Sequence, residues 1–277
     1  MSHPLKHPKR HHVPTPAWPT YKGTSLLVGT SPGGRTTVFY DPTLGHPGLQ
    51  NAQDLVAAAD HVVTANDTLF GVPGGAVNVI IFALNGATDG TGGADHASCD
   101  FVTGNNIEVC ASFGNSARVS GLFEAELSEC SMGGNLCGVS TGEALSRWCA
   151  AVVSHNALAD FATGPTWAQQ GMPDFVTQTF TGTPTVPGDQ DPVSTGCAMV
   201  FLSWLQGPAN TTGLMQFSLS RIAQAMVALG TGGTLAQLYG NLTADLPANA
   251  FPKFIAAVNN LPTGVTGDDP FGGFTPA

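Results

Sequence analysis

Short apolar runs bounded by Gly, Pro or Asn dominate the first part of the chain and predict β-strands. They lie at residues 24–29, 36–40, 77–84 and 107–111. Between the second and third runs, Leu55, Ala59 and Val62 recur at the spacing of one helical face, which predicts an amphipathic helix over residues 48–70. The chain is therefore expected to begin with strands and one long helix.

From residue 117 onward the pattern changes to helices separated by turns rich in Gly and Pro. The predicted helices are 117–132, 141–156, 167–176, 194–206, 216–229, 233–243 and 249–260. Strands followed by helices are typical of an α+β fold and not of alternating βαβ units. We therefore expect an α+β fold with an N-terminal mixed β-sheet and one long helix, followed by a mainly helical C-terminal half.

The two ends of the chain differ in composition from its body. Residues 1–22 combine basic residues, histidines and prolines, and three of the nine Lys and Arg residues lie in the first ten positions. This composition is typical of an extended arm. Residues 263–277 are rich in Gly and Pro and are expected to run over the surface as a tail, which leaves residues 23–262 as a single domain.

The body of the protein is acidic and carries few charges. Only 10% of all residues are charged, with 19 Asp and Glu against 9 Lys and Arg. Because nucleic acids and anionic membrane surfaces require clustered basic residues, we exclude both as partners. No apolar run approaches the roughly 18 residues that cross a bilayer, so no transmembrane segment is expected.

Six cysteines, an even number, lie in the middle of the chain without the spacing of a zinc motif. The predicted disulfides are Cys99–Cys110, Cys130–Cys137 and Cys149–Cys197. The first two would each close a short loop, and the third follows by elimination. Buried free thiols in a reducing compartment stay open as the alternative. The even count and the low charge favour a secreted or extracytoplasmic protein, although no apolar segment of a signal peptide is visible.

All five glutamates lie between positions 108 and 143, and this clustering is the main chemical signal. In the predicted helix 117–132, Glu126 falls within the apolar stripe and Glu129 lies one turn further along the same side. Glu124 points away and is expected to be solvated. Because burying an unpaired carboxylate is costly, Glu126 needs a proton, hydrogen bonds or a cation.

Glu143 and Arg147 lie one turn apart in the next predicted helix. In the simplest interpretation they form an intrahelical ion pair. In the alternative, Glu143 faces Glu126 and Glu129, and Arg147 or a bound cation offsets their charge. Oxygen ligands would suit calcium, magnesium or manganese better than zinc.

Three segments resemble motifs of the gluzincin branch of the zincin metallopeptidases. Residues 121–129, GLFEAELSE, look like the HExxH helix, and residues 138–147, GVSTGEALSR, are similar to the second helix, GxxNEAxSD. Residues 165–176, PTWAQQGMPDFV, are similar to the WLxEGxADY element. The resemblance covers residues 36–260 in layout and implies a zincin-like fold and peptidase-like chemistry on peptide or protein substrates.

The resemblance also assigns roles to individual residues. It makes Glu126 the general base and Glu143 the third metal ligand, whereas Ala125 and Glu129 replace the two imidazole ligands. If the third segment carries a ligand instead, Gln170 replaces its glutamate. Either way the usual His-His-Glu zinc set of the family is incomplete.

Two functions therefore stay open. As an enzyme, the protein would be a divergent metal-dependent hydrolase with Glu126 as general base. Glu129, Glu143 and the loop residue His96 would then hold calcium, magnesium, manganese or zinc, supported by Arg147. Because both imidazole positions are lost, we favour a zincin-shaped binding or assembly protein without catalytic activity, which assembles through its N-terminal arm. In both cases we expect the three glutamates to meet in space, with at least one substantially buried.

Overall fold

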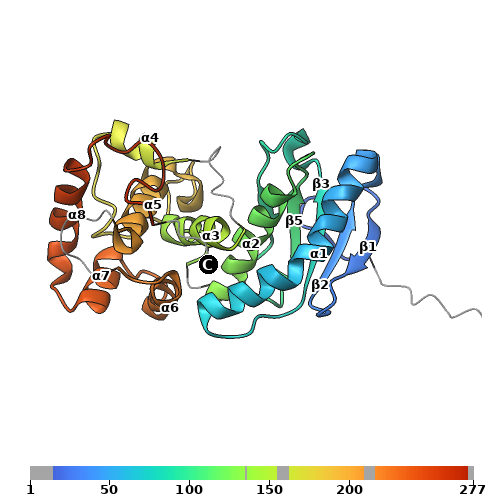
Figure 1. The fold of residues 1–277 in the computed structure, drawn as a ribbon, viewed down its shortest axis with the longest axis horizontal. Coiled ribbons are helices and arrows are strands. Elements are labelled where there is room, and N and C mark those ends of the chain that lie inside the picture. The colour runs from blue at the N-terminus through green and yellow to red at the C-terminus, as the bar shows by residue number, and fades with distance from the viewer. Residues whose placement is uncertain (1–14, 135, 155–161, 209–215, 274–277) are drawn as a thin grey trace, which may run out of the picture.

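The computed structural model describes residues 15–134, 136–154, 162–208 and 216–273. Within these residues the chain forms a five-stranded mixed sheet and eight α-helices, which confirms the predicted α+β class. Figure 1 shows the sheet and helix α1 (Gly45–Phe70) at one end of the molecule. Helices α4 to α8 lie at the other end, and α2 (Ser116–Met132) and α3 (Ser140–Val153) lie between them.

The sheet has the strand order β1-β2-β3-β5-β4. Its strands are β1 (Leu26–Thr30), β2 (Thr36–Tyr40), β3 (Val77–Phe82), β4 (Ala94–His96) and β5 (Asn106–Cys110). The three central strands run parallel, and the edge strands β1 and β4 are antiparallel to their neighbours. The strand β4 was not predicted, because three residues beside a Gly-rich segment are too few to show an alternating pattern.

The described part of the predicted N-terminal arm packs against the sheet. The Trp18 ring is buried and meets Phe39 of β2 edge-on, with the ring centroids 5.4 Å apart. The carboxylate of Glu108 in β5 is fully buried and accepts hydrogen bonds from the backbone N–H groups of Thr20 and Tyr21. Residues 18–21 are therefore part of the folded body, while residues 1–14 lie outside the described residues.

The C-terminal half is helical, as predicted. Its helices are α4 (Gly164–Gln169), α5 (Pro192–Gln206), α6 (Leu219–Leu229), α7 (Leu235–Thr243) and α8 (Ala250–Asn259). Helix α4 is shorter than the predicted helix 167–176, because Gly171 adopts a left-handed φ of 85° and Pro173 follows. Among the described residues, no helix is both long and apolar enough to span a membrane.

The core of this half is aromatic. Trp148, Trp167 and Trp204 are fully buried. The described part of the predicted C-terminal tail packs into the same core, where Phe271 is fully buried and Asp269 accepts a hydrogen bond from Ser203 of α5 at 2.6 Å. The tail thus contributes to the core rather than only covering the surface.

One disulfide joins Cys99, in the loop between β4 and β5, to Cys137, in the loop between α2 and α3. The three predicted pairings are therefore wrong, and the remaining four cysteines are buried free thiols: Cys110, Cys130, Cys149 and Cys197. The physical reason is that β5 directs Cys110 away from Cys99, toward the carbonyl groups of Leu84 and Ala87. The fold instead brings together two loops that are distant in the sequence.

Candidate functional site

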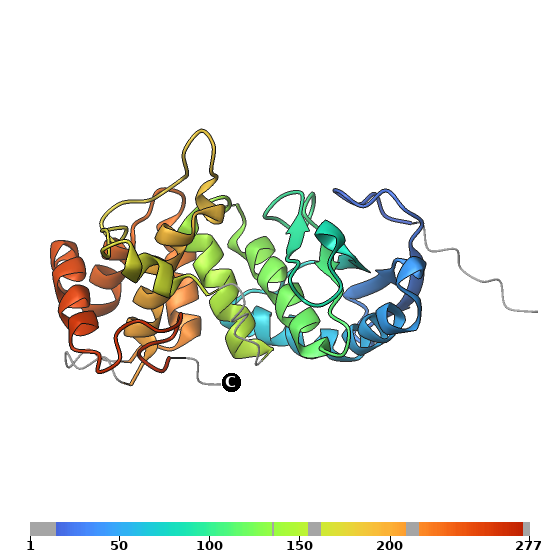
Figure 2. The same ribbon diagram turned by 90° about the horizontal axis from the view of Figure 1, so that it is seen from above.

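Helix α2 carries most of the candidate residues and is surrounded by other elements. It contacts α1, α3 and the strands β4 and β5, and Figure 2 shows it beside α3 in the middle of the molecule. The side chain of Asn115 caps the start of the helix by accepting a hydrogen bond from the N–H of Arg118, and Gly133, with a φ of 65°, ends it. A helix packed on several sides has almost no solvated face.

Glu124 shows the consequence of this packing. The sequence predicted a solvated residue, which is wrong, because the Glu124 side chain is fully buried among α1, α2 and α3. Neither of its carboxylate oxygens has a hydrogen-bond partner within the described residues. Burial, followed by the charge of Asp67, raises the pKa of Glu124 well above its usual value.

We expect the Glu124→Gln variant to be more stable than the native protein at neutral pH. Folding raises the pKa of Glu124, so the folded protein holds this proton more tightly than the unfolded chain does. The native protein therefore loses stability as the pH rises above the pKa that Glu124 has in the unfolded chain. The stability difference should therefore grow from pH 4 upward, by at most about 1.4 kcal/mol per pH unit. Urea unfolding between pH 4 and pH 8 measures it.

The matched control is Glu108→Gln, which changes the other fully buried glutamate. Because the carboxylate of Glu108 accepts hydrogen bonds from Thr20 and Tyr21, its replacement should destabilise the protein. If both variants lost the same stability at every pH, Glu124 could not be a residue that lacks a hydrogen-bond partner and holds a proton in the folded protein.

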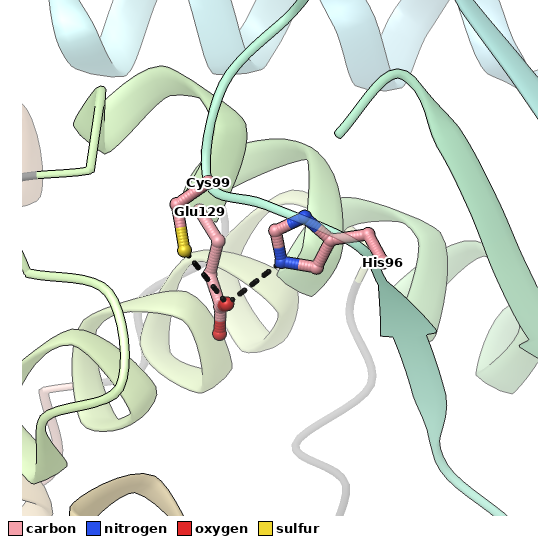
Figure 3. Close-up of side chains that lie close together, drawn as sticks. All are labelled: His96, Cys99 and Glu129. Carbon is pink, nitrogen blue, oxygen red and sulfur yellow. Dashed lines mark hydrogen bonds and ion pairs between the residues drawn. The ribbon is translucent and has the colours of Figure 1, made fainter. Parts of the chain in front are cut away.

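His96 is the centre of the candidate site. It is the last residue of β4 and pairs with Ile107 of β5, so it belongs to a strand and not to the flexible loop that the sequence suggested. This position directs its ring toward α2 (Figure 3). The ring atom Nε2 lies 3.0 Å from Glu129 Oε2 and 3.4 Å from Glu126 Oε2.

The other ring nitrogen fixes the protonation of His96. Nδ1 lies 2.7 Å from the backbone oxygen of Ser98, and a carbonyl oxygen can only accept, so Nδ1 carries a hydrogen. Nε2 therefore faces two carboxyl groups either as a second N–H donor or with a lone pair, which would accept a cation or the proton of a carboxyl group. Burial alone would lower the pKa of His96, but its hydrogen bonds with Cys130 and Glu129 and the charge of Glu126 raise it to about 11. Without another cation, His96 is an imidazolium.

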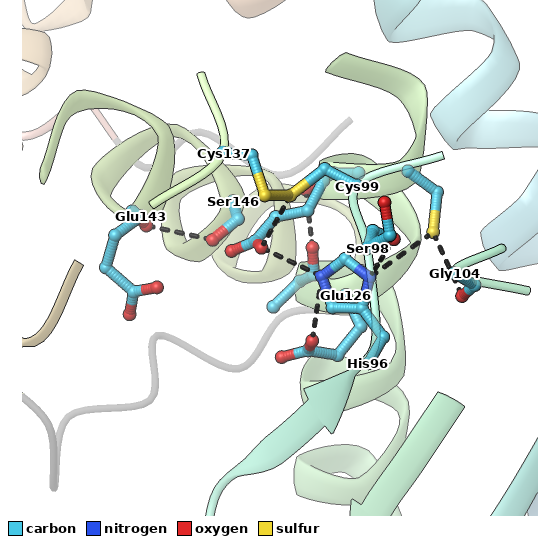
Figure 4. A network of polar contacts seen from close by, with 12 residues as sticks. His96, Ser98, Cys99, Gly104, Glu126, Cys137, Glu143 and Ser146 are labelled. Carbon is cyan, nitrogen blue, oxygen red and sulfur yellow. Dashed lines mark hydrogen bonds and ion pairs between the residues drawn. A yellow bond between two sulfur atoms is a disulfide. The ribbon is translucent and has the colours of Figure 1, made fainter. Parts of the chain in front are cut away.

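Two adjoining cavities, of about 440 Å³ and about 270 Å³, extend from His96 toward the C-terminal half. Both are lined by Glu126 and Glu143, and the second also by Glu129 and His96. The side chains of Glu126 and Glu129 are 13% and 18% exposed. The two cavities together form one cleft, and the structure brings the three predicted glutamates around it. No dashed line joins the Glu143 carboxylate to His96 in Figure 4.

Three carboxyl groups share this space with one imidazolium. Burial, followed by the charge of Glu129, raises the pKa of Glu126 well above its usual value. Burial and the charge of Glu129 also raise the pKa of Glu143 to about 8, although Arg147 lowers it. His96 lies closest to Glu129, with which it forms an ion pair, while burial favours the protonated forms of Glu126 and Glu143.

Arg147 lines the larger cavity but is paired elsewhere than predicted. Its ion pair is with Asp268 of the C-terminal segment, at 3.1 Å, and both side chains are 5% exposed. The same carboxylate accepts hydrogen bonds from the backbone N–H groups of Thr163 and Gly164. Arg147 therefore joins α3 to the C-terminal segment and the start of α4, and it acts on Glu143 only through its charge.

The residues present do not fit the zinc set of the zincin family. At the two positions that the resemblance gives to imidazole ligands, Ala125 has no ligand atom and Glu129 pairs with His96. Gln170, the alternative ligand position, is exposed and lines neither cavity. His155, the one histidine after the motif helices, lies outside the described residues.

Other acidic residues also line the cleft, and two of them, Asp189 and Asp191, were missed in the sequence. Asp95 of β4 lines the smaller cavity, Asp191 the larger one, and Asp189 lines both. Asp191 also caps α5 by accepting a hydrogen bond from the N–H of Ser194 at 2.8 Å. The Asp189–Asp191 pair before Pro192 was a readable helix-start signal, but nothing local indicated that this turn faces α2.

Comparisons with known proteins add no assignment to this geometry. A comparison with models of known protein families finds no match, and a comparison with curated protein sequences finds no significant similarity. The function must therefore be argued from the residues of the cleft themselves.

Proposed function

We propose that the protein is a non-catalytic binding protein with a zincin-like framework, and that its acidic cleft binds a cationic side chain of an extended polypeptide. The observation that carries this proposal is the position of the His96 ring between Glu126 and Glu129. If the register that the resemblance implies holds, the imidazolium of His96 would take the place of the zincin metal. Glu126, the expected general base, is engaged with this ring and is not free to activate water.

The edge strand β4 supports an extended polypeptide as the ligand. Within the described part of the chain it pairs with one strand only, β5, and its residues Ala94 and Asp95 line the cleft. The outer backbone groups of an edge strand can pair with an added strand, whose alternate side chains then point to one face. A ligand strand on β4 would therefore direct some of its side chains into the cleft.

Asp189 supports a positive charge on that side chain. It lines both cavities, and its Oδ1 atom is buried without a hydrogen-bond partner among the described residues. A buried carboxylate oxygen without a partner is costly, and a Lys or Arg side chain of the ligand would satisfy it. The cleft is therefore selective for basic over acidic peptides.

Fluorescence anisotropy with two extended peptides, identical except for Lys or Glu at the central position, tests this proposal. We expect the Lys peptide to bind the oxidised protein and the Asp189→Asn variant to bind it about tenfold more weakly, a loss of about 1.4 kcal/mol. The control is Asp60→Asn, which alters a carboxylate on α1 that accepts a hydrogen bond from the N–H of Gly33. Equal binding of both peptides, or equal effects of both variants, would contradict the proposal.

A metal-dependent hydrolase is the second candidate function. It is favoured by the hydrogen bond from His96 Nδ1 to the carbonyl of Ser98, an orientation that metal-ligating imidazoles commonly adopt. Glu129 and Glu143 would join His96 in holding calcium, magnesium, manganese or zinc, which polarises a carbonyl group, with Glu126 as general base. Incubating the same peptides with each cation decides between the two functions, because cleavage that Glu126→Gln abolishes would replace the binding proposal.

A further inference from the structure

We propose that reduction of the Cys99–Cys137 disulfide creates a zinc site from His96, Cys99, Cys137 and Glu129. The ligand atoms of His96, Cys99 and Glu129 already lie within 4.8 Å of one another, and Figure 3 shows them converging from β4, the following loop and α2. This ligand set differs from the His-His-Glu set of zincins, and it does not depend on peptide binding in the cleft.

The distances between these atoms are close to those around a tetrahedral zinc ion. Zinc bonds of about 2.1 Å to nitrogen and oxygen and 2.3 Å to sulfur place nitrogen about 3.4 Å and sulfur about 3.6 Å from the oxygen ligand. In the structure, His96 Nε2 lies 3.0 Å and Cys99 Sγ 3.9 Å from Glu129 Oε2. These two distances are within a few tenths of an ångström of the zinc values. The ligand atoms of His96 and Cys99, which lie within 4.8 Å of each other, would close to about 3.6 Å around the metal.

Cys137 supplies the fourth ligand. In the oxidised protein its sulfur is bonded to that of Cys99, and zinc requires thiolates rather than a disulfide. After reduction the two sulfurs must separate to about 3.8 Å around the metal. The Cα atoms of the two cysteines are 5.8 Å apart, a spacing that both side chains can span by rotation about χ1.

The surroundings of His96 suit it as a ligand in this site. The backbone oxygen of Ser98 accepts the hydrogen of Nδ1, which leaves Nε2 directed at Glu129. Zinc would replace the proton that Nε2 otherwise shares with this carboxylate. Cys130 stays outside the site, because its sulfur lies on the Nδ1 side of the ring, at 3.8 Å, and its thiol donates to the carbonyl of Gly104.

A small dithiol can carry out the reduction. Cys137 is exposed whereas Cys99 is buried, so the thiolate of the dithiol attacks Cys137 Sγ and Cys99 leaves as a thiolate. The second thiol of the reagent then closes the reagent's own disulfide and releases Cys137. The dithiol thus supplies both electrons, and zinc binding displaces the protons held by the two thiols and by Nε2.

Cobalt, a spectroscopic substitute for zinc, tests the proposal on the full chain. Oxidised protein, and protein reduced by a dithiol that is then removed without oxygen, are titrated with Co²⁺ and afterwards with Zn²⁺. We expect the reduced protein to bind one Co²⁺ about 100-fold more tightly than the oxidised protein, with thiolate charge-transfer and tetrahedral d–d absorption. One equivalent of Zn²⁺ should abolish both signals.

Variants identify the ligands. The Cys99→Ser and Cys137→Ser variants should each weaken Co²⁺ binding and reduce the charge-transfer absorption. Their matched reference is the reduced native protein, because it also lacks the disulfide. His96→Gln should weaken binding while the absorption remains, and Cys197→Ala, which alters a buried free thiol of α5, should change neither. Equal Co²⁺ binding by oxidised and reduced protein, or binding that is unaffected by His96→Gln, would overturn the proposal.

Discussion

Replacement of Arg147 by Met is expected to lower the free energy of unfolding by about 3–5 kcal/mol. Arg147 and Asp268 form an ion pair in which both side chains are 5% exposed. Removing the guanidinium would leave the charge of Asp268 in the interior, where water cannot solvate it. Urea unfolding of the oxidised protein, followed by tryptophan fluorescence, measures the loss.

The protein contains a matched exposed pair for comparison. Lys253 and Asp245 lie 2.6 Å apart, but the Lys253 side chain is 51% exposed. The Lys253→Met variant should therefore lose much less stability than Arg147→Met, because water screens and replaces the exposed contact. A similar loss in both variants would show that burial of the Arg147–Asp268 pair has no special cost.

A double variant, Asp268→Asn with Arg147→Met, tests whether the loss comes from the unpaired charge. The amide oxygen of Asn can still accept the hydrogen bonds from Thr163 and Gly164 that Asp268 accepts. The double variant should recover a large part of the stability lost in Arg147→Met, because no buried charge remains. Additive losses would instead indicate that the two side chains contribute independently.

The second large effect is expected from loss of the disulfide. Cys99 and Cys137 are separated by 38 positions, and for a closed loop of this length the chain-entropy relation gives a stabilisation of about 4 kcal/mol. The Cys99→Ser/Cys137→Ser variant should therefore unfold at a lower temperature, by about 2–4 °C for each kcal/mol lost. Differential scanning calorimetry of both proteins measures the change.

Peptide mapping provides the control for this effect. The denatured but unreduced protein should show four alkylatable thiols and one disulfide-linked peptide pair containing Cys99 and Cys137. Cys110→Ser, which changes a free thiol, should leave that peptide pair intact. Six alkylatable thiols, or a pairing of Cys99 with Cys110, would contradict the structure.

Local patterns were sufficient to predict the order and type of most elements. The run at 36–40 matches β2, and the predicted helix 117–132 matches α2 to within one residue. These predictions hold because the period of apolar residues reflects which side of a single element faces the core. The α+β class follows from the order of the elements, whereas the zincin-like framework stays a prediction.

The candidate site could be predicted only in part. The clustering of glutamates in two neighbouring helices indicated a shared carboxylate site, and Glu126, Glu129 and Glu143 do line one cleft. Glu124 was misassigned, because the helical stripe shows one buried side, whereas α1, α3 and the sheet together cover several sides of α2. The number of sides that are covered depends on neighbours that the helix's own sequence does not reveal.

The sequence by itself thus determined most of the elements, their order and the acidic character of the site. Only the tertiary structure decided which distant residues meet, including the pairing of Cys99 with Cys137 and of Arg147 with Asp268, 121 positions apart. It also decided that the short edge strand β4 places His96 between two carboxyl groups of α2. The reason is physical: propensity and periodicity act over a few neighbouring residues, whereas such partners are set by how complete elements pack together.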